Sequence, residues 1–483
     1  MEEAQGTMTE PKTIGALKEA GYKVISVKQE MRKNLIQKLK EKKNIFDGIM
    51  GYDETVIPYI MNAVLSCHDI ILLGERGQAK SRIMRSLIGL LDEYVPVIDG
   101  CEINDDPFNP QCKRCKELVE QQGDETAVGW ISREQRYSEK LATPDITINQ
   151  LVGDIDPIKV AEGRYLADLS AIHFGLLPRA NRGVFGINEL PDLEPKIQVA
   201  LFNVMEERDI DIGGFKVRLP LDVLVIATAN PEDYTNRGRI VTPLKDRFGS
   251  QIRTHYPTAS QTEIAIAEQE RNNHNGEYAQ KEIIPPFMKR IIAEISQLAR
   301  KEKEISQSSG VSVRMTIHNL ENLCSYALRA AIEAGEDEKG YVPRISHLRA
   351  VLPSSTGKVE LEYGSGDSTE EKVISGLIDK AVKVAFDDYF KDISFDGVVA
   401  EFIAEGQAFM TSANMKASTY ESRLEFFPEL KKVVLERFRG ISGQSQKLAS
   451  CVEFVLDGLH QNKKLNKKVS DTGTEMMYLR PGT

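Results

Sequence analysis

The 483-residue sequence has no apolar run close to the roughly 20 residues that a membrane-spanning helix requires. Its first 13 residues are polar and lack the apolar segment of a signal peptide. Six cysteines are too few for a disulfide framework in a chain of this length. These absences together predict a cytoplasmic protein that does not span a membrane.

Positive charge is also scarce, since 62 Lys and Arg residues face 72 Asp and Glu residues, for a formal net charge of −10. A duplex-DNA binder usually carries a basic face, and the sequence has no patch that interleaves basic and aromatic residues. A DNA motor and other nucleic-acid binders are therefore disfavoured. The basic segment 28–43 has helical spacing, and we interpret it as the solvated face of a packed helix rather than a membrane or nucleic-acid surface.

The most informative segment follows the apolar run 69–73 and precedes a helical pattern. It reads Gly74, Glu75, Arg76, Gly77, Gln78, Ala79, Lys80 and Ser81. This is the phosphate-loop spacing G-x-x-x-x-G-K-[ST], except that Ala79 stands at the second glycine. In such a loop the backbone N–H groups face the phosphates, Lys80 reaches the terminal phosphates and Ser81 binds Mg²⁺. Because alanine carries a Cβ, the prediction requires that position 79 does not need a positive φ.

Two further apolar strands end in polar residues. The run 184–187 ends in Asn188 and Glu189, and the run 223–227 leads to Asn230. Glu189 stands where a general base would polarise water for attack on the γ-phosphorus, and Asn230 can hydrogen-bond the γ-phosphate or that water. Asn188 keeps an oxygen for a metal-bound water but lacks the negative charge of the usual Asp. We therefore expect weaker Mg²⁺ binding and slower turnover.

The same strands bear on the fold class. Strands that are apolar on both faces and separated by helices predict a parallel sheet that is covered on both sides. A further strand is expected at 95–98, a helix near 158–180, and an almost wholly helical chain after Pro257.

Two arginines are candidate phosphate partners. Arg247 lies among small and apolar residues, and a neighbouring subunit could supply it as an arginine finger. A structural ion pair between Asp246 and Arg247 is an equally good interpretation. Arg314 opens a helix in the second half of the chain and could bring one more cation to the nucleotide.

Cys101, Cys112 and Cys115 form a C-x₁₀-C-x₂-C pattern, and the last pair has the spacing of a zinc knuckle. No fourth ligand is evident. The other candidates are remote in sequence or are carboxylates: Cys67, His68, His173, Asp105 and Asp106. The sequence therefore leaves two alternatives, a structural zinc ion and a metal-free or redox-responsive thiol pair, and it favours the second.

Taken together, these motifs resemble the AAA+ ATPases, in the branch shared by MoxR proteins and the magnesium chelatase I subunit, over about residues 45–355. A phosphate loop with Ala before Lys is common among MoxR proteins. The stretch 177–183 resembles the one that precedes the acidic strand, and Gly51, within 49–52, resembles the segment beside the adenine. By the same resemblance, Asn230 is similar to the sensor-1 residue, Arg247 to the arginine finger and Arg314 to sensor 2.

The resemblance implies an α/β fold, a P-loop AAA+ domain with a five-stranded parallel sheet followed by an α-helical lid and an α-helical C-terminal domain. The expected divisions are an N-terminal extension with the basic helix (1–44), the AAA+ domain (45–258), the lid (259–355), a Gly- and Ser-rich linker (353–368), the C-terminal domain (369–465) and a polar, mobile tail (466–483). The AAA+ domain is expected to contain a Cys-bearing insertion (100–136), a helix-2 insert (154–175) and a pre-sensor-1 hairpin (209–219).

The resemblance also implies an activity. It is that of an ATP- and Mg²⁺-dependent remodelling motor, chaperone-like in its action, which works as a homo-oligomeric ring, as a hexamer, with ATP between neighbours. Residues 369–483 contain no D-x-S-x-S motif, so a partner with a metal-adhesion domain of the von Willebrand A type would be a separate protein. Two alternatives stay open: the motor subunit of a metal chelatase, and a nucleotide-gated scaffold whose hydrolysis is weak because of Asn188.

Overall fold

The computed structural model describes residues 10–155, 172–206, 209–212, 215–230, 239–274, 283–307, 309–336, 341–362, 369–404, 408–470 and 475–481. The chain forms two compact units, Met1–His255 and Tyr256–Thr483. No helix among the described residues combines the length and apolarity that crossing a bilayer would need.

The N-terminal unit is built on a five-stranded parallel sheet, which confirms the predicted fold class. The strand order is β11-β1-β10-β7-β4. The strands are β1 (Ile70–Leu73), β4 (Tyr137–Leu141), β7 (Gly183–Asn188), β10 (Val223–Ala229) and β11 (Ser250–Arg253). The register pairs Leu73 with Ala229 and Ala227 with Ile187, so β1, β10 and β7 end at the same edge of the sheet.

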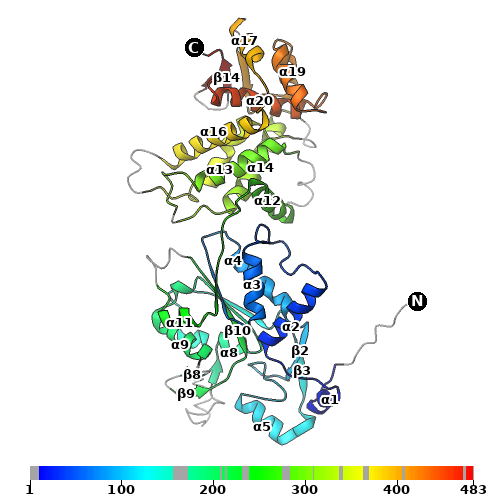
Figure 1. Ribbon diagram of the computed structural model, residues 1–483, viewed down its shortest axis with the longest axis vertical. Helices are drawn as coiled ribbons and strands as arrows, with labels where there is room; N and C mark the ends of the chain where they lie inside the picture. The colour runs from blue at the N-terminus through cyan, green and yellow to red at the C-terminus, as the bar shows by residue number, and fades with distance from the viewer. Residues whose placement is uncertain are drawn as a thin grey trace, which may run out of the picture. The chain divides into compact units, whose positions relative to one another are not determined.

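Both faces of the sheet are buried, and successive residues of a strand enter different cores. Ile70 and Leu72 pack with α2 and α3 in one cluster, whereas Ile71 and Leu73 pack with α9 and α11 in another. Figure 1 shows these helix pairs on opposite sides of the strands. The helices of this unit are α1 (Ile14–Glu19), α2 (Val27–Lys40), α3 (Val56–Leu65), α4 (Lys80–Ser86), α5 (Lys113–Gln122), α6 (Ile148–Leu151), α8 (Leu176–Arg179), α9 (Pro195–Glu206) and α11 (Thr242–Arg247).

Short antiparallel pairs surround the sheet. They are β2 (Tyr94–Ile98) with β3 (Val128–Ser132), β5 (Gly153–Ile155) with β6 (Ile172–Phe174), and β8 (Asp209–Ile212) with β9 (Phe215–Arg218). The hairpin predicted at 209–219 is confirmed. The strand predicted at 95–98 is also present, but it pairs with β3 rather than with the central sheet.

The helix predicted near 158–180 is wrong where the structure describes it, because residues 172–174 form a strand and only 176–179 are helical. Most of the predicted helix-2 insert, 154–175, lies outside the described residues.

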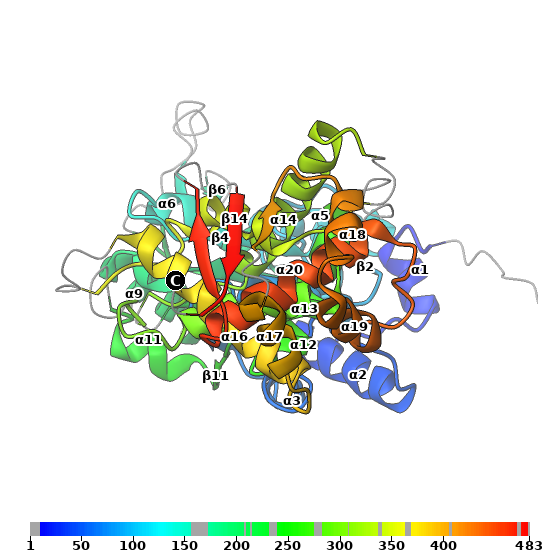
Figure 2. The same cartoon turned by 90° about the horizontal axis from the view of Figure 1, so that it is seen from above.

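The C-terminal unit is mainly helical. Its helices are α12 (Ser260–His274), α13 (Pro286–Ala299), α14 (Arg314–Glu333), α15 (Leu352–Ser355), α16 (Glu370–Tyr389), α17 (Asp396–Ala404), α18 (Ala417–Leu424), α19 (Pro428–Arg437) and α20 (Ser445–Gln461). One hydrophobic core runs from Ala267 to Tyr478 and includes residues from both predicted helical domains. The helix α20 packs against α16, α18 and α19, among which it lies in Figure 2.

Two expectations for this unit are wrong. The tail expected to be mobile contains β13 (Asn466–Val469) and β14 (Glu475–Leu479), which form an antiparallel sheet with β12 (Phe409–Ser412). Tyr478 is fully buried, so this sheet is part of the core. The linker expected at 353–368 begins inside α15, and Leu361 forms a β-bridge with Ile305.

Candidate functional site

The predicted phosphate loop lies between β1 and α4, at the edge where the central strands end. The Gly74 N–H donates to the Ala229 carbonyl of β10 (3.1 Å). A Cβ at Gly74 would lie 1.9 Å from Thr254 Oγ1 and 2.2 Å from Gln78 Oε1, so only glycine fits. Gln78 Oε1 accepts hydrogen bonds from the Glu75 N–H (3.2 Å) and the Thr254 hydroxyl (2.6 Å). The shape of the loop is therefore held by bonds within it and to the end of β11.

Ala79 corrects one expectation. Its backbone is left-handed, with φ 56° and ψ 16°, and it is the N-cap residue of α4. Position 79 does need the positive φ that glycine adopts without strain, and the loop forms with alanine there. A left-handed L-residue costs about 1–2 kcal/mol, which the rest of the loop has to offset.

Lys80 is buried, and its ammonium group lies over the loop. Lys80 Nζ donates to the carbonyls of Gly74 (2.5 Å) and Glu75 (2.8 Å). Neutral carbonyls are weaker partners for an ammonium group than phosphate oxygens. The contacts of Lys80 with these carbonyls are thus of a kind that an arriving anion can replace.

Tyr52 ties the segment 49–52 to the loop. Its hydroxyl lies 3.0 Å from the Gln78 carbonyl and 2.7 Å from the His255 carbonyl, and it can donate to either. Burial raises the pKa of Tyr52 to about 12, so the phenol keeps its proton at neutral pH. Gly51 precedes it with φ 81°, a conformation that glycine adopts readily. The segment predicted to lie beside the adenine is thus bonded to the phosphate loop.

A hydrogen-bonded chain joins α4 to the ends of β7 and β10. The Ser81 hydroxyl donates to Asn188 Oδ1 (2.9 Å), and the Thr228 hydroxyl donates to the same oxygen (3.2 Å). Thr228 Oγ1 accepts in turn from the Glu189 N–H (3.1 Å). Glu189 has a left-handed backbone (φ 56°) and is partly exposed. The structure therefore brings together Ser81, Asn188 and Glu189, the three residues predicted to act on the metal and the water.

Glu139 of β4 is a carboxylate that the sequence analysis missed. It accepts a hydrogen bond from Asn188 Nδ2 and a two-pronged contact from Arg85, whose Nε and Nη2 lie 2.7 and 2.9 Å from its oxygens. The bond with Arg85 lowers the pKa of Glu139, which is therefore ionised at neutral pH. A carboxylate only accepts, so it fixes the Asn188 amide with its oxygen toward Ser81. The negative charge of Glu139 is thus hydrogen-bonded directly to the uncharged Asn188 side chain.

The remaining predicted residues differ in where they lie. Asn230 is buried and directly follows β10, one residue beyond the Ala229 carbonyl that accepts from Gly74. Arg247 ends α11 and pairs with Glu206 of α9, with its guanidinium carbon 5.1 Å from the centre of the Phe202 ring. The predicted Asp246–Arg247 pair is thus replaced by a pair with Glu206. Arg314 belongs to the C-terminal unit, where it is exposed at the start of α14.

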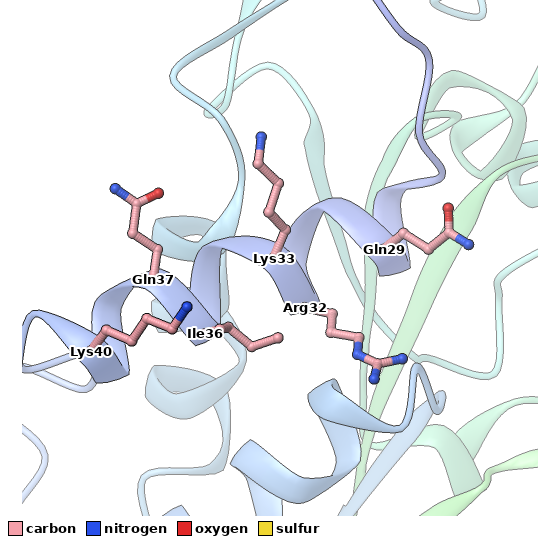
Figure 3. Close-up of a pocket in the computed structure, with 6 residues that line it drawn as sticks. All are labelled: Gln29, Arg32, Lys33, Ile36, Gln37 and Lys40. Atoms are coloured by element: carbon pink, nitrogen blue, oxygen red, sulfur yellow. The ribbon is translucent and has the colours of Figure 1, made fainter.

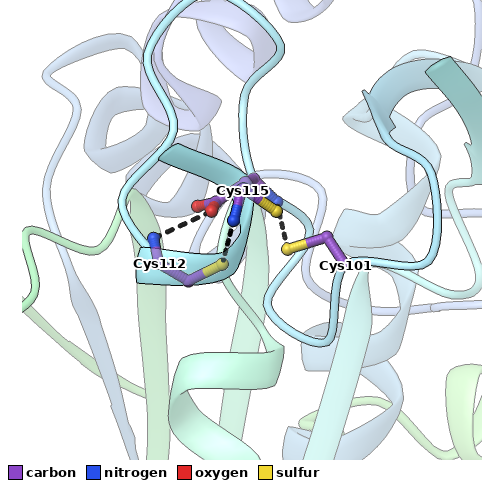
Figure 4. Close-up of side chains that lie close together, drawn as sticks. Cys101, Cys112 and Cys115 are labelled. Carbon is purple, nitrogen blue, oxygen red and sulfur yellow. Dashed lines mark hydrogen bonds between the residues drawn. The ribbon is translucent and has the colours of Figure 1, made fainter. Parts of the chain in front are cut away.

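The three predicted cysteines do lie together. Figure 4 shows the side chains of Cys101, Cys112 and Cys115 converging. Asp105 completes the cluster, and one ligand atom from each of the four residues lies within 4.8 Å of the others. Asp106 has a different role, because its Oδ1 accepts the Phe108 N–H (2.8 Å).

The basic helix predicted at 28–43 corresponds to α2. Its apolar residues Val27, Met31 and Leu35 are buried in the core, as expected of a packed helix. Its outer face forms a shallow groove of about 480 Å³. Figure 3 shows Lys33 and Gln37 pointing to one side of the helix and Arg32 to the other. No group of acidic or aromatic side chains lines this groove, so it is a solvated basic surface.

Sequence reasoning did not single out Thr228, Thr254 or Glu139, and it included Tyr52 only as part of the segment 49–52. Thr228 had a signal, because it is the first hydroxyl after the apolar run of β10. Glu139 and Thr254 had none, since they follow from which strands lie beside β7 and β1.

Comparisons with known proteins found an AAA family model and magnesium-chelatase relatives. A family model, the AAA domain of the dynein-related subfamily, matches residues 127–248, which contain Asn188, Glu189, Asn230 and Arg247 but not the phosphate loop. The chain is 28% identical over 234 residues to the magnesium-chelatase subunit ChlI-2 of Arabidopsis thaliana. The aligned segment covers 46% of this chain and 51% of that relative. The chain is also 28% identical over 212 residues to the ChlI homolog of Methanocaldococcus jannaschii, covering 43% and 53%.

These matches span about half the length of the curated relatives. Among solved structures, a model of the complex between subunits BchI and BchD of magnesium chelatase aligns with a TM-score of 0.35 and 19% identity, over 69% of this chain and 98% of that one.

Proposed function

We propose that this chain, as a member of the AAA+ ATPases in the branch of the magnesium chelatase I subunits, binds ATP with Mg²⁺ at its phosphate loop and hydrolyses it to ADP and phosphate. The observation that carries the proposal is the hydrogen bond of 2.9 Å between Ser81 of α4 and Asn188 of β7. It joins the phosphate-loop helix to the strand that Glu189 directly follows. A phosphate-binding element and a candidate general base thus share one edge of the sheet.

The residues at this edge fit a nucleotide with its metal. Gly74 lacks the Cβ that would close the loop, Lys80 supplies a buried ammonium group, and the first N–H groups of α4 face outward from the helix N-terminus. The Ser81 hydroxyl and the Asn188 amide oxygen are the hard oxygen donors that Mg²⁺ prefers. The ion, when bound, would neutralise negative charge on the phosphate oxygens.

The chain's own residues would then divide the work. Lys80 exchanges its loop carbonyls for phosphate oxygens. Glu189 accepts a proton from the water that attacks the γ-phosphorus, and Asn230 orients that water or the γ-phosphate. Hydrolysis would depend on the positioning of the reactants and on charged and polar groups that are already in place to stabilise the transition state.

Glu139 favours a working ATPase over a scaffold with weak hydrolysis. Asn188 lacks the charge of the usual Asp, but its amide bridges Ser81 and the ionised Glu139. We propose that Glu139 supplies the negative charge near the metal that Asn188 does not. An Asp at position 188 would face Glu139 as a like charge, so Asn188→Asp should not raise turnover.

Steady-state phosphate release in the presence of Mg²⁺ tests these statements. The purified chain should hydrolyse ATP, and Glu189→Gln should lower turnover by about 10²–10⁴-fold, the contribution typical of a general base, while ATP still binds. Unchanged turnover in Glu189→Gln would overturn the assignment of Glu189. A large gain in Asn188→Asp would show that the native chain is a weak hydrolase and that Glu139 does not compensate.

Assembly and client follow from the resemblance, and we extend the proposal to them. A ring, as a hexamer, would place Arg247 of one subunit near the nucleotide of the next, and the motor would remodel a separate partner protein. The names of the relatives favour a chelatase motor as the second candidate. Light scattering of Glu189→Gln with and without ATP tests the ring. Capture of binding partners by the same variant, followed by mass spectrometry, distinguishes chelatase subunits from other clients.

A further inference from the structure

We propose that Cys101, Asp105, Cys112 and Cys115 form a structural zinc site in the N-terminal unit. Cys101 lies in the loop after β2, Cys112 is the N-cap residue of α5, and Cys115 lies in its first turn. One sulfur or carboxylate oxygen from each residue lies within 4.8 Å of the other three. Tetrahedral zinc with Zn–S bonds near 2.3 Å and Zn–O bonds near 2.1 Å needs ligand atoms about 3.5–3.8 Å apart. A contraction of about 1.3 Å at most would therefore complete the site.

A second observation points to a cation at the same place. The Asp105 carboxylate is fully buried, and its Oδ2 accepts the Cys112 N–H (2.9 Å). Its Oδ1 has no hydrogen-bond partner among the residues that the structure describes. A buried carboxylate oxygen without a partner is costly, and native proteins rarely keep one. A metal ion bound by the three thiolates would satisfy it.

The backbone is already arranged to support metal-bound thiolates. The Cys115 N–H points to Cys112 Sγ, and the Asp105 N–H points to Cys101 Sγ, each at 3.3 Å. Such N–H···S contacts orient the ligands of a metal and stabilise their charge. The N-terminus of α5, a helix of 10 residues, adds a favourable field at Cys112.

The alternative, a redox-responsive thiol pair, fits the surroundings poorly. Cys112 and Cys115 are 8% and 0% exposed and belong to the hydrophobic core of the unit. A reactive thiol needs access for its oxidant or its disulfide partner. A disulfide would also use two of the three thiols and leave the buried Asp105 oxygen without a partner.

The position of the cluster indicates what the metal would do. The segment between β2 and α5 is a loop, and Asn104 donates from its Nδ2 to the Arg179 carbonyl (2.9 Å). The Asn181 Nδ2 donates to the Ile103 carbonyl (3.0 Å). Residues 179–182 lead directly into β7, the strand that ends in Asn188 and is followed by Glu189. Zinc would therefore hold the loop that supports the start of this strand.

Elemental analysis of the full-length chain, purified under reducing conditions without chelator, tests the site. We expect about one zinc per chain, and less than a tenth of that in Cys112→Ser and Asp105→Asn. The matched control is Cys67→Ser, a cysteine on α3's side of the sheet outside the cluster, which should keep its zinc. Zinc absent from the wild-type chain after addition of Zn²⁺ and dialysis, or retained in Cys112→Ser, would overturn the proposal.

Cobalt gives a readout that needs no variant. After chelation and addition of Co²⁺, the wild-type chain should show the visible ligand-field bands of a tetrahedral ion and sulfur-to-metal charge-transfer absorption, and added Zn²⁺ should remove both. An octahedral Co²⁺ spectrum would contradict the site. So would a Cys112–Cys115 disulfide in protein that was purified under reducing conditions. Chelation should also lower the thermal midpoint of the N-terminal unit, because the binding energy of a structural metal adds to folding.

Discussion

The phosphate-loop edge of the N-terminal unit and the polar cluster around Glu453 in the C-terminal unit both gather polar side chains from distant segments, but in different ways. Lys80 is bonded to carbonyls of its own loop, and Glu189 is partly exposed. Glu453 is 1% exposed and accepts from the Ser346 N–H (2.7 Å), the Ser346 hydroxyl (3.1 Å) and the Tyr420 hydroxyl.

This contrast separates functional from structural polar groups in the chain. At the strand ends, the partners are ones that a ligand can replace. Around Glu453, every bond is enclosed in the core. Substitutions at the first region should therefore change binding or turnover, and substitutions at the second should change the free energy of unfolding.

Substitution of Arg247 should have the greatest effect on turnover. It also tests the contrast between the two regions, because the Arg247 guanidinium already pairs with Glu206 and could be structural instead. If a neighbouring subunit uses it as an arginine finger, Arg247→Ala should lower kcat by about 10³–10⁵-fold with ATP affinity nearly unchanged. Glu206→Gln is the matched control and should keep its turnover. Equal losses of stability in both variants, with kcat intact, would make Arg247 a structural residue. Phosphate release and urea unfolding measure the two outcomes.

Glu453→Leu should have the largest effect on stability. It leaves the Ser346 and Tyr420 donors buried without an acceptor, so we expect a loss of about 3 kcal/mol in the free energy of unfolding. Tyr420→Phe removes one donor only and should cost about 1 kcal/mol. ATP affinity should not change in either variant. Urea denaturation followed by circular dichroism measures the free energy of unfolding, and titration calorimetry measures the ATP affinity.

Lys80→Ala tests a residue that should matter for ATP binding and little for stability. Loss of the ammonium group should weaken ATP binding by about 100-fold, the scale of a charge-assisted hydrogen bond. The free energy of unfolding should stay within about 1 kcal/mol of the wild-type value. Isothermal titration calorimetry measures the affinity. Lys33→Ala, on the exposed face of α2, is the control and should bind ATP normally.

A pH dependence should distinguish the C-terminal unit. Burial lowers the pKa of His347 to about 3. Its Nδ1 accepts the Arg344 N–H (3.2 Å) and its Nε2 lies 3.1 Å from the Ala413 carbonyl, so a second ring proton would break the first bond. An unfolded His titrates near pH 6.5, so the unfolded chain binds more protons than the folded one below that pH.

The stability from neutral His347 is thus complete above about pH 6.5 and is lost as the pH falls toward 3. We expect the contribution of His347 to the free energy of unfolding to be about 2 kcal/mol smaller at pH 5 than at pH 7. Glu453, whose pKa burial raises, acts in the opposite direction. The difference between wild type and His347→Gln, measured by urea unfolding at both pH values, isolates the His347 part. An equal pH dependence in both chains would contradict this prediction.

Ala79→Gly should have the smallest effect. Glycine removes the strain of the left-handed backbone but increases the entropy of the unfolded chain, so a net gain of about 0.5–1 kcal/mol in the N-terminal unit is expected. Ala79→Val should lower stability, because a β-branched residue fits this conformation worse. Thermal unfolding of the two variants should shift in opposite directions.

Within the central sheet, the strands that could be predicted from the sequence are those buried on both faces. The segments 70–73, 184–187 and 223–227 are continuous apolar runs because helices cover both sides of the sheet. The edge strand β4 carries no such run, since its side chains are only partly buried or exposed. The tail strands β13 and β14 escaped prediction because β14, which pairs with β13, is held in the sheet by β12, a strand more than 50 residues earlier in the chain.

The position of the phosphate loop can be predicted from the chain alone, because all of its characteristic residues lie within 74–81. The sequence also predicts that Asn188, Glu189 and Asn230 follow buried strands. Three contacts became evident only in the folded chain: Glu139 faces Asn188, Thr254 supports Gln78, and Asp105 joins three cysteines. These contacts depend on strand order and loop path, which arise from packing between distant segments and leave no local pattern in the chain.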